Sequence, residues 1–420
     1  MLFVKECKKV LFSLTFLVYF LTVLAMYFTQ FHSDNREALE RPVSGSNDYG
    51  MISKEIPEIL MPAAVDSLVS EYLSGSFTAY PYGFIKYVRL TEKKKTQIAG
   101  IISEVSGITV QELNSFEGFE QGSYIMDENG SFLYQEPVIP EVNIPEDLTY
   151  EHFRELMQEA DRIIGGGSKY SDDYIVGNFS RVPQTYEDAL TEYEQFLNED
   201  KITGAYARLY CDYLGIVMAV LPVFVAASLA NLDKKSRMEQ LAYSRRISST
   251  KLIFTRFIAL VAVMMIPVIL TAVIANNMVS SLYPGYAMDR FAIFRYALFW
   301  LVPNIMTASA VGMLVTELSS GLFAIFVQSA WWFTSVFSSA GRLTGGIGRF
   351  TLEMRHNSLM GRDIFFAQWE NIVFNRAFYT VISLLGIALT AFVYEQKRRG
   401  VFNGLALKIN RQSFKRQSKA

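Results

Sequence analysis

The chain has 420 residues, of which 51% are hydrophobic and 19% are charged, and its two cysteines are Cys7 and Cys211. This length allows more than one domain, and two cysteines exclude a scaffold stapled by several disulfides. The formal net charge of −2 hides two opposite segments: residues 31–205 carry 31 acidic and 13 basic side chains, and the remainder carries 10 and 26. Segments of such opposite charge are expected on opposite sides of a membrane, the basic one facing the cytoplasm.

The first apolar run, residues 10–31, follows a basic head and is long enough for a transmembrane helix. A cleaved signal peptide is the alternative. The run exceeds the usual apolar region of about 7–15 residues, however, and no A-x-A-like site follows it. We therefore expect residues 1–31 to form a cytoplasmic head and an uncleaved transmembrane helix 1.

Residues 32–205 resemble a water-soluble domain. Helical spacing of apolar residues predicts four helices, at 56–73, 91–107, 148–167 and 184–201. The stretch GSYIMDENGSFLYQ (122–135) predicts a pair of short strands around Glu128, Asn129 and Gly130. We expect an α+β extracytoplasmic domain, inserted between transmembrane helices 1 and 2.

Apolar runs return in residues 206–396. They predict five further spans, near 209–230, 252–276, 291–316, 320–338 and 377–394. The fold class expected is therefore a polytopic α-helical membrane protein with six transmembrane helices. Six spans place both termini on one side, and the basic head, the basic loop at 232–250 and the basic tail at 397–420 all favour the cytoplasm.

The segment 339–376 must then be external, although it carries five arginines. Its mixture of apolar and charged residues is consistent with an external or a re-entrant segment. The location expected for the whole chain is the plasma membrane of a bacterial cell, crossed several times.

Sequence motifs for catalysis are missing. The chain has no G-x-x-x-x-G-K-[ST] phosphate loop, no G-x-S-x-G elbow and no H-E-x-x-H helix. The three histidines are scattered and none has metal-ligand spacing. We expect a chain without a catalytic site, without a bound metal or cofactor and without a nucleic-acid partner.

A few polar residues lie within the predicted spans. Asn304 and Gln328 either line a substrate path or form hydrogen bonds between helices. Trp331 and Trp332 are either interfacial anchors or the aromatic wall of a pathway. Three charged side chains, those of Asp212, Arg256 and Arg295, are expected near span ends, reaching water by snorkelling.

The charged stretch at 232–250 separates two spans. Asp233 stands where a helix N-cap would, and apolar residues recur at helical spacing through Ile247. An amphipathic helix on the cytoplasmic face could dock a soluble partner. A basic loop bound to anionic lipid is the alternative, and it explains the charges but not the amphipathic order.

The sequence MEQLAYSRRISSTKLIFTRFIALV, which leads into the third span, resembles the permease subunits of ABC-2 type ATP-binding-cassette exporters. In that family a Glu, a few apolar residues, a small basic turn and a Lys mark the coupling helix that docks onto a separate ATPase. The residues expected to couple are Asp233, Arg237, Glu239, Leu241, Ser244, Arg245, Arg246, Ile247, Ser248 and Lys251.

The resemblance implies a permease that exports its substrate with energy from ATP and Mg²⁺ held by a cytoplasmic ABC ATPase subunit. A second permease subunit, identical or paralogous, would complete the pathway within the lipid bilayer. Many family members have only a short loop after the first span, whereas this chain has a large domain there. Because of this departure, the resemblance does not identify the substrate. The alternative function is a membrane-anchored sensor or assembly factor with an extracytoplasmic ligand-binding domain. An ion-coupled transporter is disfavoured, because no inverted repeat and few charges at membrane depth are apparent.

Overall fold

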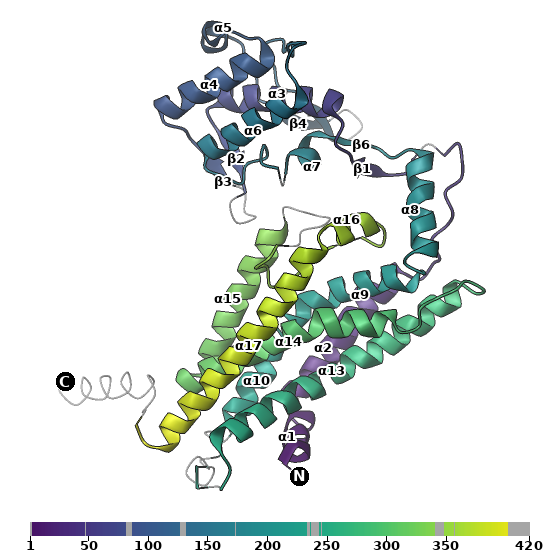
Figure 1. The fold of residues 1–420 in the computed structure, drawn as a ribbon, viewed down its shortest axis with the longest axis vertical. Coiled ribbons are helices and arrows are strands. Elements are labelled where there is room, and N and C mark those ends of the chain that lie inside the picture. Colours follow the sequence, from purple (N-terminus) through teal and green to yellow (C-terminus); the bar gives the residue numbers. More distant parts are fainter. Residues whose placement is uncertain are drawn as a thin grey trace, which may run out of the picture. The chain divides into compact units, whose positions relative to one another are not determined.

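The structure is a computed structural model of the chain. It describes residues 2–46, 48–80, 86–126, 132–172, 174–232, 236, 243–244, 246–340, 348–356 and 358–401. The chain divides into two compact units. Residues 1–41 and 190–420 make the first, and residues 42–189 make the second. Helices predominate in both units (Figure 1).

Several helices of the first unit are long and apolar enough to cross a membrane. Within the described residues there are four of them, namely α2 with its π-helical extension η1 (Leu14–His32), α13 (Ser249–Leu282), α14 (Ala292–Leu318) and α17 (Trp369–Arg398). The bent pair α9 (Thr203–Met218) and α10 (Pro222–Ala230) makes a fifth if it is one span. The chain is thus a polytopic helical membrane protein.

The predicted span at 320–338 corresponds to α15 (Gly321–Ala340), whose apolar part, Gly321–Phe337, is shorter than the other spans. The sixth span therefore stays a prediction. The predicted ends also differ from those observed. Helix α13 extends beyond 252–276 on both sides, and α17 begins eight residues before the predicted start at 377.

The basic head is a helix of its own. Helix α1 (Leu2–Leu11) ends before Ser13, and α2 (Leu14–Met26) begins after it. The hydroxyl of Ser13 accepts a hydrogen bond from the Phe16 N–H at 3.1 Å, which caps α2 at its N-terminus. The predicted single run at 10–31 is therefore interrupted by a serine cap.

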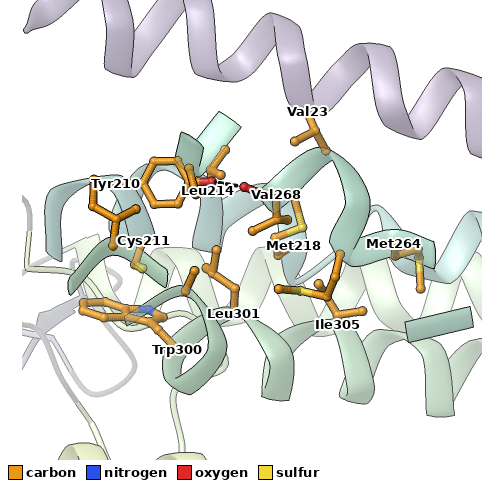
Figure 2. Packing of buried hydrophobic residues seen from close by; sticks show 14 of the residues in the cluster. Val23, Tyr210, Cys211, Leu214, Met218, Met264, Val268, Trp300, Leu301 and Ile305 are labelled. Carbon is orange, nitrogen blue, oxygen red and sulfur yellow. Dashed lines mark hydrogen bonds between the residues drawn. The ribbon is translucent and has the colours of Figure 1, made fainter. Parts of the chain in front are cut away.

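Helix α14 lies at the centre of the first unit, where it packs against α9, α10, α13, α15 and α17. Figure 2 shows buried side chains of α9, α13 and α14 meeting there, with Met218, Val268 and Leu301 among them. A Cβ at Gly312 would lie 2.7 Å from the Cβ of Ala226, so glycine is what permits α14 to approach α10 so closely.

The second unit has its own hydrophobic core. Helices α3 (Pro57–Ser74), α4 (Glu92–Ser106) and α6 (Tyr150–Ile164) pack together and bury residues such as Leu68, Ile102 and Met157. The shorter helices are α5 (Val110–Ser115) and α7 (Ile175–Phe179), and α8 (Tyr186–Asn198) runs into the first unit. The four predicted helices are confirmed as α3, α4, α6 and α8.

Three two-stranded antiparallel sheets are found among the described residues of the second unit. They pair β1 (Met51–Ser53) with β6 (Arg181–Pro183), β2 (Phe77–Ala79) with β3 (Lys86–Val88), and β4 (Ser123–Met126) with β5 (Phe132–Gln135). The last pair confirms the predicted strands, with Ser123 opposite Gln135. The predicted turn residues Glu128, Asn129 and Gly130 lie outside the described residues.

Candidate functional site

Part of the predicted coupling segment is described. Asp233, Arg237, Glu239, Leu241 and Arg245 lie outside the described residues. The side chains of Ser244, Arg246 and Lys251 are exposed, and Ile247 is half-buried against the bundle core. Ser248 is the N-cap of α13, since its hydroxyl accepts a hydrogen bond from the Lys251 N–H at 3.3 Å.

The C-terminal turn of α17 holds this segment. Arg398 donates hydrogen bonds from Nε to the Tyr243 carbonyl (2.9 Å) and from Nη1 to the Ile247 carbonyl (2.8 Å). The Ser249 hydroxyl donates to a carboxylate oxygen of Glu395 at 2.5 Å. Tyr243, Ile247 and Ser249 are therefore bonded to the last helix, next to the start of α13. The sequence pattern does not indicate this attachment, because Arg398 belongs to a segment with the composition of a basic tail.

Buried ion pairs join the same helix ends to their neighbours. Lys397 of α17 donates to the Glu317 carboxylate of α14 (3.1 Å) and to the Glu317 backbone carbonyl. Arg256 of α13 pairs with Glu6 of α1 at 3.2 Å, and both side chains are almost fully buried. The prediction that Arg256 snorkels is wrong, because α1 folds back onto α13 and supplies a carboxylate.

Predicted pathway residues of α15 form hydrogen bonds to the bend between α9 and α10. Pro222 has no N–H, and the Val220 and Val223 N–H groups bond to carbonyls three residues back, at Val217 and Val220. The helix thus leaves the carbonyls of Ile216 and Ala219 without their usual α-helical donors. Two side chains replace these donors, namely Trp332 Nε1 at 2.8 Å from Ile216 O and Gln328 Nε2 at 2.7 Å from Ala219 O.

Asn304 lies close to the same bend. Its amide nitrogen donates to the Gly215 carbonyl at 3.3 Å, and its amide oxygen accepts from Arg376 at 2.7 Å. Trp331 is half-buried beside Tyr379 of α17. The four residues are thus gathered around the α9–α10 bend, and Asn304 and Gln328 form hydrogen bonds between helices, which was one of the two uses predicted.

Arg376 is a buried arginine within a helix that is long and apolar enough to cross a membrane. It is the eighth residue of α17, about 11 Å along the helix, and its side chain is 2% exposed. Nη1 donates to the Trp300 carbonyl (2.8 Å) and to Asn304, Nη2 donates to the Leu352 carbonyl (3.3 Å), and both Nε and Nη2 donate to Asn375. Every donor of the guanidinium therefore meets a neutral oxygen.

Residues 348–356, between α15 and α17, enter the bundle without forming a helix. Asn375 donates to the carbonyls of Gly348 and Thr351 at 2.8 Å each, and the Tyr379 hydroxyl donates to that of Phe350 at 2.7 Å. Irregular backbone is tolerated inside a helical membrane protein only where protein groups satisfy its hydrogen bonds. The polar residues at the start of α17 do this here.

Asp212 of α9 also binds this segment. Its carboxylate accepts a hydrogen bond from the His356 N–H at 3.2 Å and lies 4.0 Å from Arg355, and the Asp212 side chain is 4% exposed. The predicted snorkelling of Asp212 is therefore wrong as well. The prediction holds for Arg295, which is exposed and paired with Asp289.

Two titratable side chains of the segment are buried as well. Burial raises the pKa of the Glu353 carboxyl to about 7 and lowers the pKa of His356 to about 4. His356 Nε2 lies 2.9 Å from the Met360 carbonyl. The count of six spans predicts an external or re-entrant position for this segment, and the sequence pattern indicates neither residue as a site.

No family model, no curated protein and no solved structure matches this chain. Among the described residues, no three His, Cys, Asp or Glu side chains are grouped closely enough to hold a metal ion. Two features therefore remain as candidate functional sites: the segment 243–249 on the end of α17, and the polar cluster formed by the α9–α10 bend, Arg376 and residues 348–356.

Proposed function

We propose that this chain is the permease subunit of an ABC-2 type transporter that exports its substrate with ATP hydrolysed by a separate subunit. The observation that supports this most is the double hydrogen bond from Arg398 to the carbonyls of Tyr243 and Ile247. A partner that moved residues 233–251 would displace α13, which follows directly, and α17 through Arg398. Motion at one surface would then reach both helices.

The proposed topology has six spans with both termini in the cytoplasm. Helix α15 is the sixth, and its 17 apolar residues lie at the short end of the range that crosses a bilayer. The acidic region 32–205 would lie outside the cell, with residues 339–376 on the same side. Two permease subunits, identical or paralogous, would enclose the pathway in the plasma membrane.

The α9–α10 bend also fits a transporter. Interrupted helices in transporters place backbone polar groups at a substrate or coupling site, where side chains of neighbouring helices satisfy them. Gln328 and Trp332 do this for the carbonyls of Ala219 and Ile216. We propose that Asn304, Gln328, Trp331 and Trp332 adjoin the pathway at this bend.

The coupling role can be tested by charge reversal. The double substitution Arg245→Glu plus Arg246→Glu should sharply reduce both co-purification of the ATPase encoded by a neighbouring reading frame and the hydrolysis of ATP by the complex. Membrane insertion should be unaffected, because five unchanged residues, 247–251, separate these arginines from the nearest predicted span, which begins at 252. Co-purification from membranes, followed by an ATPase assay in nanodiscs, measures both.

A charge-matched control is Lys86→Glu plus Lys93→Glu, which changes two exposed residues of the second unit. This control should behave as the wild type. Unchanged ATPase binding and hydrolysis in the Arg245/Arg246 variant would refute the proposed coupling role.

A sensor or assembly factor is the second candidate function. The observation in its favour is that residues 42–189 form a compact unit with a separate hydrophobic core. A neighbouring open reading frame that encodes a Walker A loop favours the transporter. The absence of such a reading frame favours the sensor. The buried charges Asp212, Arg256 and Arg376 correct the expectation of few charges inside the bundle, so the case against an ion-coupled transporter now depends on the missing repeat alone.

A further inference from the structure

Glu353 has an unusual environment for a carboxyl group. Its side chain is 0% exposed, and neither of its oxygens accepts a well-formed hydrogen bond among the described residues. An ionised carboxylate that is removed from water without hydrogen bonds is costly, whereas the protonated acid is neutral and much cheaper to bury. The packed position therefore favours a bound proton.

The neighbouring guanidinium does not neutralise Glu353 by direct pairing. All five N–H donors of Arg376 are directed at oxygens of Trp300, Asn304, Leu352 and Asn375. The nearby Ser335 hydroxyl and the backbone N–H of Glu353 favour the carboxylate, and the positive charges of Arg376 and Arg355 favour it at a distance. Burial outweighs these four influences, and the pKa of Glu353 is raised to about 7.

Other titratable groups surround the segment. Asp212 and Arg208 come from α9, Asp200 lies just before that helix, Arg376 and Tyr379 come from α17, and Arg355 and His356 belong to the segment itself. The pKa of the packed His356 imidazole is lowered to about 4, whereas the exposed imidazole has a pKa near 6.5. Opening the segment below about pH 6.5 therefore lets His356 bind a proton, which opposes the effect of Glu353. Asn375 and Ser335, which hold the backbone of the segment, carry no titratable group.

We infer that Glu353 is a proton-binding site, and that its proton keeps residues 348–356 packed into the bundle. When the segment leaves the bundle, the carboxyl group meets water and regains an ordinary acidity. The ionised form then favours the open segment, and the protonated form favours the packed one. This inference does not depend on the transporter proposal, because it needs only the packing of this segment.

The sign of the pH effect follows from linkage. The carboxyl has a pKa near 4.5 when exposed and about 7 when packed, so the open segment loses its proton first as pH rises. The contribution of Glu353 to packing is fully present below about pH 4.5, is lost between about pH 4.5 and 7, and levels off above that range. Glu353 alone would lower the packed-to-open equilibrium on the order of 100-fold across this window. Because His356 acts in the opposite sense below about pH 6.5, the net fall between about pH 5.5 and 8.5 should be roughly 3-fold.

Hydrogen exchange of the full-length protein in lipid nanodiscs tests the inference. Peptides that cover 348–356 are compared at about pH 5.5 and about pH 8.5, after correction for the intrinsic pH dependence of exchange. The wild type should lose protection by a few-fold at the higher pH. In Glu353→Gln only His356 still titrates, so this variant should reverse the dependence and be less protected at about pH 5.5 than at about pH 8.5. Glu370→Gln, a change at an exposed acid on the first turn of α17, should behave as the wild type.

Wild-type protection that is independent of pH would overturn the inference, and so would an unchanged pH dependence in Glu353→Gln. If that variant does not fold, Ser335→Ala provides the test. Removing a hydroxyl that favours the carboxylate should move the midpoint of the wild-type transition to higher pH. A midpoint that stays in place or moves to lower pH would contradict the role of Glu353.

Discussion

The two units use charged side chains in different ways. In residues 42–189, Arg154 pairs with Glu55 and Asp172, whose side chains are 52% and 56% exposed. In the helical bundle, Arg256 pairs with Glu6, and Arg208 pairs with Asp200, in each case between side chains that are at most 6% exposed. Water already stabilises the first kind of charge, whereas the second kind depends on its protein partner. Losing one partner should therefore cost far more in the bundle.

The largest effect is expected at Arg376. Arg376→Ala would leave the oxygens of Trp300, Asn304, Leu352 and Asn375 without these donors, and it would open a cavity. We expect a loss of about 4–5 kcal/mol in the free energy of unfolding, seen as a large fall in the unfolding temperature of purified protein. Arg376→Lys, with three donors in place of five, should lose less. Equal and small losses in both variants would show that the cluster contributes little to stability.

The Glu6–Arg256 pair provides a second test of the difference between buried and exposed ion pairs. Glu6→Leu removes the carboxylate that pairs with the buried Arg256 and should cost about 3 kcal/mol. Arg256→Leu should cost less, because Glu6 remains paired with Lys9 at 2.6 Å. The double variant removes both charges and should recover most of this loss, because well-packed apolar residues often replace a buried ion pair at little cost. Unfolding temperatures of the four proteins give the coupling energy. A double variant as unstable as the sum of the singles would refute this view.

The smallest effect is expected in the second unit. Asp172→Asn removes one carboxylate from the exposed pair with Arg154 and should change the free energy of unfolding by less than about 1 kcal/mol. Local stability can be followed by hydrogen exchange of α6 in the full-length chain, with added salt as a second variable. The wild-type and variant proteins should become alike as salt screens the pair. A loss above about 2 kcal/mol would mean that the surface pair behaves like a buried one.

Sequence reasoning succeeded where the signal is local. The helices of the second unit and the strand pair at 122–135 were predicted from the spacing of apolar residues over one or two dozen positions. The long apolar helices were predicted in the same way. Their predicted ends lie next to charged residues, however, and differ from the observed ends. The predicted last span began just after Arg376, because hydropathy counts an arginine as a cost whether or not it has partners inside the protein.

The amino-acid sequence by itself determined that this is a helical membrane protein and which stretches form its apolar helices, because apolar length and periodicity are properties of neighbouring residues. The tertiary structure alone decided which charges are buried and what satisfies them. Glu6 meets Arg256 across 250 residues of chain, and Arg376 meets Asn304 across 72. Such pairings depend on how helices pack, so a pattern read along the chain records the charge but not the partner.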